Sequence, residues 1–407
     1  EAHRQKMEAW LYDEDRWPSG CAGGRTTEGN DERLALALTW AEDAASLDPG
    51  LLDHAVAFTR KTGEGGMELL ADRPENLAGT GVFYERRSTR GHARYNGEGC
   101  PDLLNPATTR EFIDNTYERY SKLFRYDFGK YMPGIFTDEP SVNRSIKLRP
   151  TDDQEPWSFP WTAGFAEYFE KIHGYSPLGR LHHLLDGLPE GFQFRHDFWR
   201  TVNERFIESY TQPISEWCKE RELLFTGHYL FEDDFRRMIL SGGSVMAHYE
   251  YMDIPGVDHL GRRTGDPWNI KQAASVANQL GKKRVVSELY GASGQDMTFD
   301  DMKWIADYNL ALGVTFLCLH LTHFSLRGDG KRDFPPTFSY HQPYWDQFRV
   351  MNDYLARVSW AVSRGKSAAE ILVLHPVGSA CGALDMGAED GGAELKKLER
   401  SFRTLVE

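Results

Sequence analysis

The stretch GIFTDEP at residues 134–140 combines an apolar run, two adjacent carboxylates and a proline. A continuous apolar run indicates a strand buried on both faces, and proline cannot continue the hydrogen bonding of a strand. The pattern therefore places Asp138 and Glu139 where a buried strand reaches the surface. A second stretch, RVVSELYG at 284–291, ends its apolar run with Glu288 in the same way. We expect Glu139 and Glu288 to face each other across one site.

Further apolar runs extend this pattern along the chain. The strand candidates lie at 7–12, 82–87, 134–138, 223–228, 245–251, 284–287 and 314–319. Helical periodicity separates most of them, and this alternation is typical of a parallel sheet covered by helices. Polar residues gather after almost every run, at the strand ends where a (β/α)8 barrel keeps its active site. We find no GxGxxG or GxxxxGK[ST] motif, which a doubly wound open sheet often carries.

These observations predict an α/β fold of the (β/α)8 TIM-type barrel class, with the first strand missing from this chain. We expect the barrel to span residues 1–365, with insertions near 51–95 and 150–195. The residue pattern changes after Gly365. Residues 371–375 form a new strand candidate, and the apolar residues of 393–406 have helical spacing. Residues 366–407 are therefore predicted to begin an accessory α/β (flavodoxin-like) domain, truncated at the last residue. Further domains of the same polypeptide are expected as partners.

The composition limits the classes of partner. A formal charge of −14 disfavours nucleic acid and anionic membranes, because both select basic surfaces. No apolar run approaches the ~18 residues of a membrane span, so no membrane partner is expected. The five cysteines include no CxxC pair and imply no disulfide framework. The first six residues do not form a signal peptide.

Two carboxylates on separate barrel strands are the usual catalytic residues for hydrolysing a glycosidic bond. One carboxyl protonates the leaving oxygen, and the other activates water or attacks the sugar itself. We therefore predict Glu139 and Glu288 as the catalytic pair, with Glu139 the candidate acid and Glu288 the candidate base, although the sequence also allows the reverse assignment. Residues near the strand ends are predicted to bind the sugar: Trp17, Asp102, Asp138, His228, Tyr229, Asp258, Tyr290, His320 and His323.

Several of these residues have an alternative role. Asp102 and Asn105 could instead cap the following helix. The pair His320-x-x-His323 could instead contribute to a zinc site, although on a straight strand the two side chains would point to opposite faces. The aromatic content of 13% suits either a large core or a sugar-binding cleft.

A set of motifs, in order along the chain, resembles the α-L-rhamnosidases of glycoside hydrolase family 106. The motifs are WLYDEDRWPSG at 10–20, DLLNP at 102–106, FTDEP at 136–140, PGVDHL at 255–260, SELYG at 287–291 and the region 320–345. The resemblance covers about residues 7 to 375. Segments 51–95 and 378–381 depart from it.

The resemblance implies a (β/α)8 catalytic domain that cleaves terminal α-L-rhamnosidic bonds by an inverting mechanism, in bacterial breakdown of polysaccharides or glycosides. It also suggests a calcium ion near the sugar, although no cofactor is required by the residues themselves. A periplasmic or extracellular location is slightly favoured for such an enzyme. The alternatives are another barrel glycosidase, such as a β-galactosidase-like enzyme, a non-catalytic carbohydrate-binding barrel, or a metal-dependent hydrolase.

Overall fold

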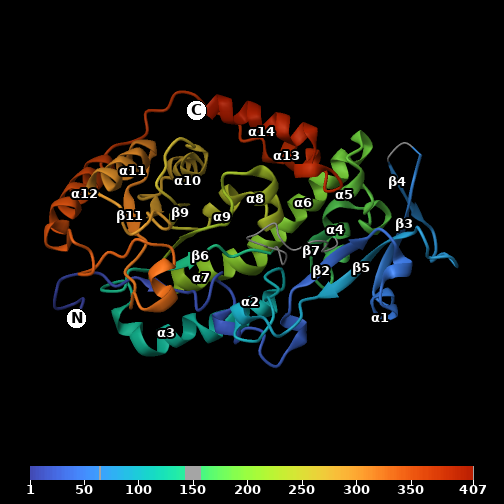
Figure 1. Ribbon diagram of the computed structural model, residues 1–407, viewed down its shortest axis with the longest axis horizontal. Coiled ribbons are helices and arrows are strands. Elements are labelled where there is room, and N and C mark those ends of the chain that lie inside the picture. The colour runs from blue at the N-terminus through green and yellow to red at the C-terminus, as the bar shows by residue number, and fades with distance from the viewer. Residues whose placement is uncertain (64–65, 143–156, 407) are drawn as a thin grey trace.

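A six-stranded parallel sheet forms the centre of the molecule in a computed structural model that describes residues 1–63, 66–142 and 157–406 (Figure 1). Its strands, in spatial order, are β1 (Leu11–Tyr12), β6 (Gly134–Asp138), β8 (Leu224–His228), β9 (Ile254–His259), β10 (Val286–Leu289) and β11 (Phe316–Leu319). All neighbouring pairs run parallel, as the continuous apolar runs predict.

The parallel sheet is curled. Trp10 precedes one edge strand and Phe316 opens the other, yet their ring centroids are 5.4 Å apart. Both rings pack against a small cluster formed by Phe136, Ile254 and Val286 of the strands between. The sheet therefore bends until its edges approach each other. The described residues form a half barrel of parallel strands, and the eight strands of a closed barrel are not all present among them.

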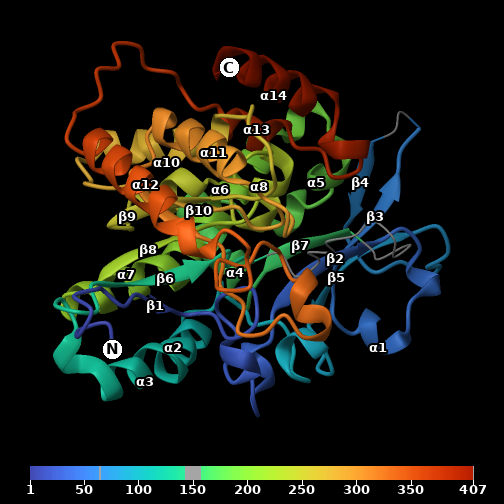
Figure 2. The same ribbon diagram turned by 60° about the vertical axis from the view of Figure 1, so that its left-hand side comes forward.

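Helices cover the convex side of the sheet (Figure 2). The helices are α2 (Pro106–Asn115) and α3 (Tyr117–Phe124), α6 (Phe192–Phe206) continuing through a π-helical turn at Ile207–Thr211 into α7 (Gln212–Glu220), α10 (Trp268–Gln279), α11 (Phe299–Leu312) and α12 (Phe348–Val362). The apolar faces of α2, α3, α6, α7 and α10 pack in one large core rich in aromatic side chains, whereas those of α11 and α12 pack in a second cluster with Leu289 of β10. No helix in the described part of the chain is long and apolar enough to cross a membrane.

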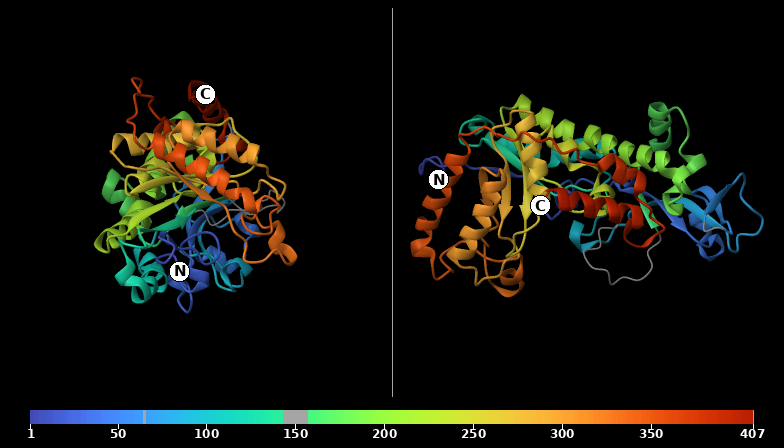
Figure 3. Two further views of the ribbon diagram at one scale, coloured as in Figure 1. Left: turned by 90° about the vertical axis from the view of Figure 1, so that its left-hand side faces the viewer. Right: turned by 90° about the horizontal axis from the view of Figure 1, so that it is seen from above.

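A second sheet extends from one end of the half barrel (Figure 3). It is five-stranded and antiparallel, in the order β4 (Met67–Leu70), β3 (Ala55–Lys61), β5 (Gly81–Arg87), β2 (Leu36–Ala41) and β7 (Trp157–Trp161). The prediction of 82–87 as a barrel strand was therefore wrong, because this segment pairs with β2 and β3. The insertion expected at 51–95 lies in this sheet. The insertion expected at 150–195 begins outside the described residues and continues as β7, α4 (Phe165–His173) and α5 (His183–Asp186).

The run at 245–251, predicted as a strand, is largely helical and contains α9 (Val245–Tyr249), which follows α8 (Phe235–Ser241). The strand of this region follows as β9, which was not among the strand candidates. Residues 371–375 have no regular secondary structure, so the strand expected there is also wrong.

The helices at the end of the chain are α13 (Val377–Ala383) and α14 (Ala393–Val406). They contribute Cys381, Leu384 and Phe402 to the same core as the parallel sheet. These residues therefore pack against the hydrophobic core of the parallel sheet. The assignment of 366–407 to a flavodoxin-like domain stays a prediction.

Candidate active site

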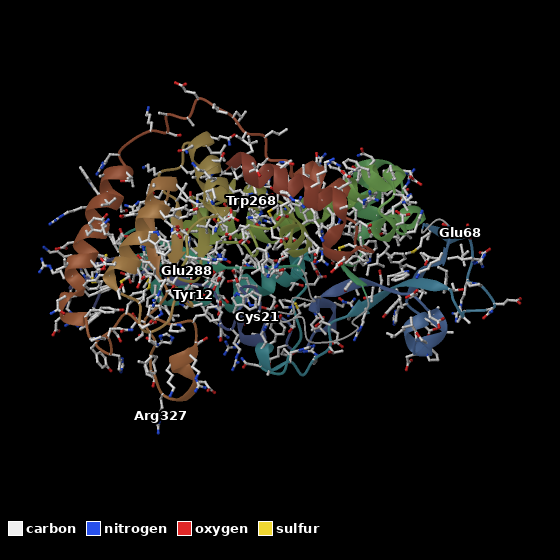
Figure 4. All side chains as sticks on the ribbon, turned by 45° about the horizontal axis from the view of Figure 1, so that its top comes forward. Tyr12, Cys21, Glu68, Trp268, Glu288 and Arg327 are labelled. Atoms are coloured by element: carbon white, nitrogen blue, oxygen red, sulfur yellow. The ribbon has the colours of Figure 1, made fainter. Side chains whose placement is uncertain are left out.

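The carboxyl ends of the parallel strands bring the predicted acids together around His228. The Nε2 atom of this buried histidine lies 2.8 Å from Glu288 Oε2 and 3.5 Å from Asp138 Oδ1. Its Nδ1 atom lies 4.0 Å from Glu139 Oε1. His228 therefore separates the two predicted catalytic carboxylates and contacts Glu288 directly. Figure 4 shows Glu288 beside Tyr12 near the middle of the molecule, in keeping with the effect of Glu288 on the pKa of Tyr12.

Close strand packing explains how His228 reaches Asp138. Gly227 has a φ of 133°, and a Cβ atom there would lie 1.9 Å from the carbonyl oxygen of Thr137. Only glycine permits this approach of β8 to β6, which pairs Asp138 with His228 in the register of the sheet. Glu139, the residue after β6, lies in the left-handed region with a φ of 49°. Its backbone N–H donates to His228 O at 3.1 Å. Such a conformation costs a non-glycine residue about 1–3 kcal/mol, so the surrounding fold holds Glu139 in place.

Glu139 is a candidate proton donor. Burial raises its pKa to about 7, helped by the negative charges of Asp138 and Glu288. The positive charge of His228 and a hydrogen bond from Trp17 Nε1, 2.7 Å from Glu139 Oε2, oppose this rise without cancelling it. A carboxyl with a pKa near neutrality keeps its proton at mildly acidic pH and can transfer it.

Glu288 has the opposite character. Burial alone would raise its pKa, but the hydrogen bond and charge of His228, together with the charge of His320, leave the pKa below its usual value. His320 Nε2 lies 3.7 Å from Glu288 Oε1. Burial also works against a charged His228, yet Glu288 and Asp138 hold its pKa well above the usual value. Glu288 is therefore an ionised carboxylate beside a buried imidazolium, which suits a general base.

The predicted sugar ligand Asp258 lies next to Glu288. The two residues are partners in the register of β9 and β10. Asp258 Oδ1 is buried and has no hydrogen-bond partner among the described residues. Asp258 also lines a cavity of about 150 Å³ together with His259, Arg263 and Asn269. Burial, with the charges of Glu139 and Glu288, raises its pKa well above the usual value. A polar group without a partner at a cavity wall suits a role in binding a polar ligand.

The end of β1 and the segment after it contribute Tyr12 and Glu14, which were not among the predicted site residues. Tyr12 donates a hydrogen bond to Asp138 Oδ2 and lies 2.9 Å from Glu14 Oε2. Burial, with the hydrogen bond and charge of Asp138, raises the pKa of Glu14 to about 9, so Glu14 stays protonated at neutral pH. The sequence pattern that could have indicated these residues is YDEDRW at 12–17, where three acids follow an apolar run.

A buried acid supports the same segment. Asp13 accepts hydrogen bonds from Ser19 Oγ at 2.5 Å and from the Tyr117 hydroxyl at 2.6 Å. Ser19 Oγ in turn accepts from the backbone N–H of Asp138 at 2.7 Å. Asp13 therefore fixes the loop that carries Trp17 against the end of β6.

Two tyrosines predicted to bind sugar lie in the core. The Tyr229 hydroxyl is 2.6 Å from Thr211 Oγ1, and the Tyr290 hydroxyl donates to the Met302 carbonyl at 2.9 Å. Both side chains are almost fully buried, with exposures of 3% and 0%. The prediction is wrong for this structure, because each ring packs inward and its hydroxyl is already paired.

Asp102 and His323 also have structural partners. Asp102 is buried, accepts from Thr162 Oγ1 at 2.7 Å and accepts from the Leu104 N–H at 3.1 Å. The capping alternative holds for Asn105, which accepts from the Ala107 N–H at the start of α2, and not for Asp102. His323 Nε2 donates to the Asp333 carbonyl at 2.6 Å, so this ring faces its own loop.

The residues around His228 do not fit the calcium ion that the family resemblance suggests. The ligand atoms of Asp138, His228 and Glu288 lie within 4.8 Å of one another. Calcium takes 6–8 oxygen ligands, whereas this group includes a protonated imidazole that is hydrogen-bonded to one of its two carboxylates. A zinc pair of His320 and His323 is not formed either, because their Nε2 atoms face Glu288 and the Asp333 carbonyl.

Comparison with known proteins identifies the family. Glycoside hydrolase family 106, described as alpha-L-rhamnosidase, matches residues 116–387. The chain belongs to this family. A Formosa agariphila protein provisionally named a beta-glucuronidase is 27% identical over 235 residues, which are 54% of this chain and 19% of the relative. The structure of a rhamnosidase from Novosphingobium sp. PP1Y is similar with a TM-score of 0.53 and 19% identity, over 75% of this chain and 30% of that chain.

This structural likeness shows a shared α/β fold of the half-barrel region. The chain spans about a fifth of the length of the Formosa relative and under a third of the Novosphingobium rhamnosidase.

Proposed function

We propose that this chain carries the catalytic site of a glycoside hydrolase that cleaves terminal α-L-rhamnosidic bonds in glycans or glycosides. The observation that carries the proposal is the arrangement of two buried glutamates on either side of one imidazolium, which leaves one glutamate protonated and the other ionised. Glu139 donates a proton to the leaving oxygen, and Glu288 removes a proton from the attacking water. The family match supports the rhamnoside as substrate.

The distance between the acids is compatible with inversion. Contacts on both sides of His228 place Glu139 Oε1 and Glu288 Oε2 no more than about 9 Å apart, which does not exceed the ~6.5–9.5 Å separation of inverting enzymes. His228 Nδ1 is buried, faces Glu139 and has no hydrogen-bond partner among the described residues. We propose that a sugar hydroxyl accepts this N–H, and that Trp17, Asp138, Asp258 and His320 complete the contacts.

The charges of the site favour a neutral sugar. The strongest charge effects on Glu139 and Asp258 come from other acids and from His228, which is hydrogen-bonded to Glu288. The carboxylate of a glucuronide would meet this excess of negative charge, and like charges repel strongly in a buried site. A neutral 6-deoxy sugar avoids this cost. The name of the Formosa relative nevertheless makes a glucuronide the natural competitor to test.

A panel of aryl glycosides tests the proposal. The p-nitrophenyl α-L-rhamnoside, β-D-glucuronide and β-D-galactoside are each offered to the protein, and the product anomer is followed by NMR. We expect hydrolysis of the rhamnoside, with β-L-rhamnose as the first product. Cleavage of the glucuronide alone would contradict the substrate, and α-L-rhamnose as first product would contradict inversion. Sugar binding without any hydrolysis would favour the non-catalytic carbohydrate-binding alternative.

A further inference from the structure

A half-exposed aromatic side chain lies next to His320, the neighbour of the proposed base. Phe334 belongs to the long segment after β11, and 47% of its surface is exposed. Its ring centroid is 6.2 Å from that of His320, at an interplanar angle of 61°. His320 Nε2 is in turn 3.7 Å from Glu288 Oε1. His320 therefore lies between a half-exposed phenyl ring and the carboxylate that is proposed to activate water.

The backbone holds this ring in a defined place. Phe334 has a φ of 44°, in the left-handed region that residues with a Cβ rarely adopt. The carbonyls on both sides are anchored, since Asp333 O accepts from His323 Nε2 at 2.6 Å and Pro335 O accepts from the Ser293 N–H at 2.8 Å. A strained conformation persists only where its surroundings enforce it, and such positions cluster at functional sites.

Burial does not explain why a phenylalanine stands here, because much of the ring remains in water. We propose that Phe334 stacks on the apolar C–H face of the substrate pyranose and holds the sugar against His320 and Glu288. A flat apolar ring next to polar groups matches a pyranose, which has apolar faces and a hydroxyl-bearing edge. Phe334 is thus a substrate-binding residue, and the inference rests on the proposed function because it places the sugar beside Glu288.

The same geometry gives a role to His323. Its ring faces its own loop, where its hydrogen bond fixes the carbonyl that directly precedes Phe334. His323 is therefore a positioning residue for the stacking ring. His323→Ala should raise KM and leave kcat nearly unchanged. His323→Gln, whose amide can still donate to the Asp333 carbonyl, should restore KM.

Saturation-transfer difference NMR tests the stacking directly and does not depend on hydrolysis. L-Rhamnose, D-galactose and D-glucuronic acid are tested as ligands of the wild-type protein and of Phe334→Ala, Phe334→Tyr and Phe324→Ala. Phe324 is a matched control, because it lies in the same segment and is fully exposed at 105%. We expect saturation of the sugar C–H protons in the wild type, in Phe334→Tyr and in Phe324→Ala, and a several-fold loss in Phe334→Ala.

Kinetics give the second readout on any glycoside of the panel that the wild type cleaves. Phe334→Ala should raise KM about tenfold, equivalent to about 1.4 kcal/mol, and change kcat less. Unchanged saturation and KM in Phe334→Ala would overturn the inference, as would equal losses in Phe324→Ala or the absence of any sugar signal with the wild type. If no glycoside is hydrolysed but Phe334→Ala loses the sugar signal, the proposed function fails and the stacking role stands.

Discussion

The ends of β6 and β10 present the same residue in similar surroundings, with opposite results. Glu139 and Glu288 are both largely buried, and burial pushes both pKa values upward. Glu288 accepts a hydrogen bond from His228 at 2.8 Å, whereas Glu139 meets the other side of the same ring at 4.0 Å. The comparison shows that burial alone does not assign the roles of acid and base. The distance from each carboxylate to one buried imidazolium does.

The largest effect is expected from Glu288→Gln, which removes the proposed base for every substrate. Because general base catalysis contributes about 10²–10⁴-fold, kcat should fall by about 10³-fold or more, whatever the leaving group. Glu68→Gln in β4 is the control, since Glu68 is exposed at the far end of the molecule (Figure 4) and activity should not change. Activity of Glu288→Gln within tenfold of the wild type would remove Glu288 from the mechanism.

The loss of activity in Glu139→Gln should depend on the leaving group of the substrate. We expect a loss of about 10²–10³-fold on substrates with poor leaving groups, which need a proton, and a much smaller loss on activated aryl glycosides, which do not. The measurement is kcat/KM across a series of aryl rhamnosides of decreasing leaving-group pKa. An equal loss across the series would show that Glu139 does not act as the proton donor.

His228→Gln should reduce the difference in pKa between Glu139 and Glu288. The cation lowers the pKa of both glutamates, so both pKa values should rise when it is removed. Activity requires Glu288 ionised and Glu139 protonated, and therefore both limbs of the pH profile should move to higher pH. We expect a loss of about ten- to hundredfold in kcat/KM at pH 5. Thermal unfolding monitors the fold, and unmoved limbs in a folded variant would contradict the role of His228.

Trp17→Phe tests the weaker influence on Glu139. The indole N–H lowers the pKa of Glu139 by a single hydrogen bond, so its removal should raise that pKa and move only the alkaline limb to higher pH. One hydrogen bond to an ionisable group corresponds to about three- to tenfold in kcat/KM. A shift of the acidic limb instead would indicate that Trp17 acts on Glu288.

Much of the frame could be predicted from the sequence. Continuous apolar runs located β6, β8, β10 and β11, and the carboxyl ends of parallel strands must share one edge, so the pairing of Glu139 with Glu288 followed. The run at 245–251 misled because a short apolar run fits a buried helix as well as a strand. The pairing partners of 82–87 are set by β2 and β3, which local pattern cannot reveal.

Side-chain direction at the strand ends was harder to predict. Tyr229 and Tyr290 follow His228 and Glu288 along the chain by one and two residues, yet both turn into the core. Tyr290 has a φ of 78°, and a tyrosine in the sequence gives no sign of such a left-handed backbone conformation. Tyr12 and Glu14 reach the site because β1 lies beside β6, and that neighbourhood exists only in the folded sheet.

The protonation of Glu139 is tested by the pH dependence of kcat/KM for the wild type and for Glu139→Gln, measured on an aryl rhamnoside with a poor leaving group, which needs the proton. Wild-type activity should fall as the pH rises through about 7, where Glu139 loses its proton, and this limb should disappear in the residual activity of Glu139→Gln while the acidic limb of Glu288 remains. A limb near pH 7 that persists in Glu139→Gln would contradict the account and assign the proton to another buried acid, such as Glu232, whose pKa burial raises to about 8.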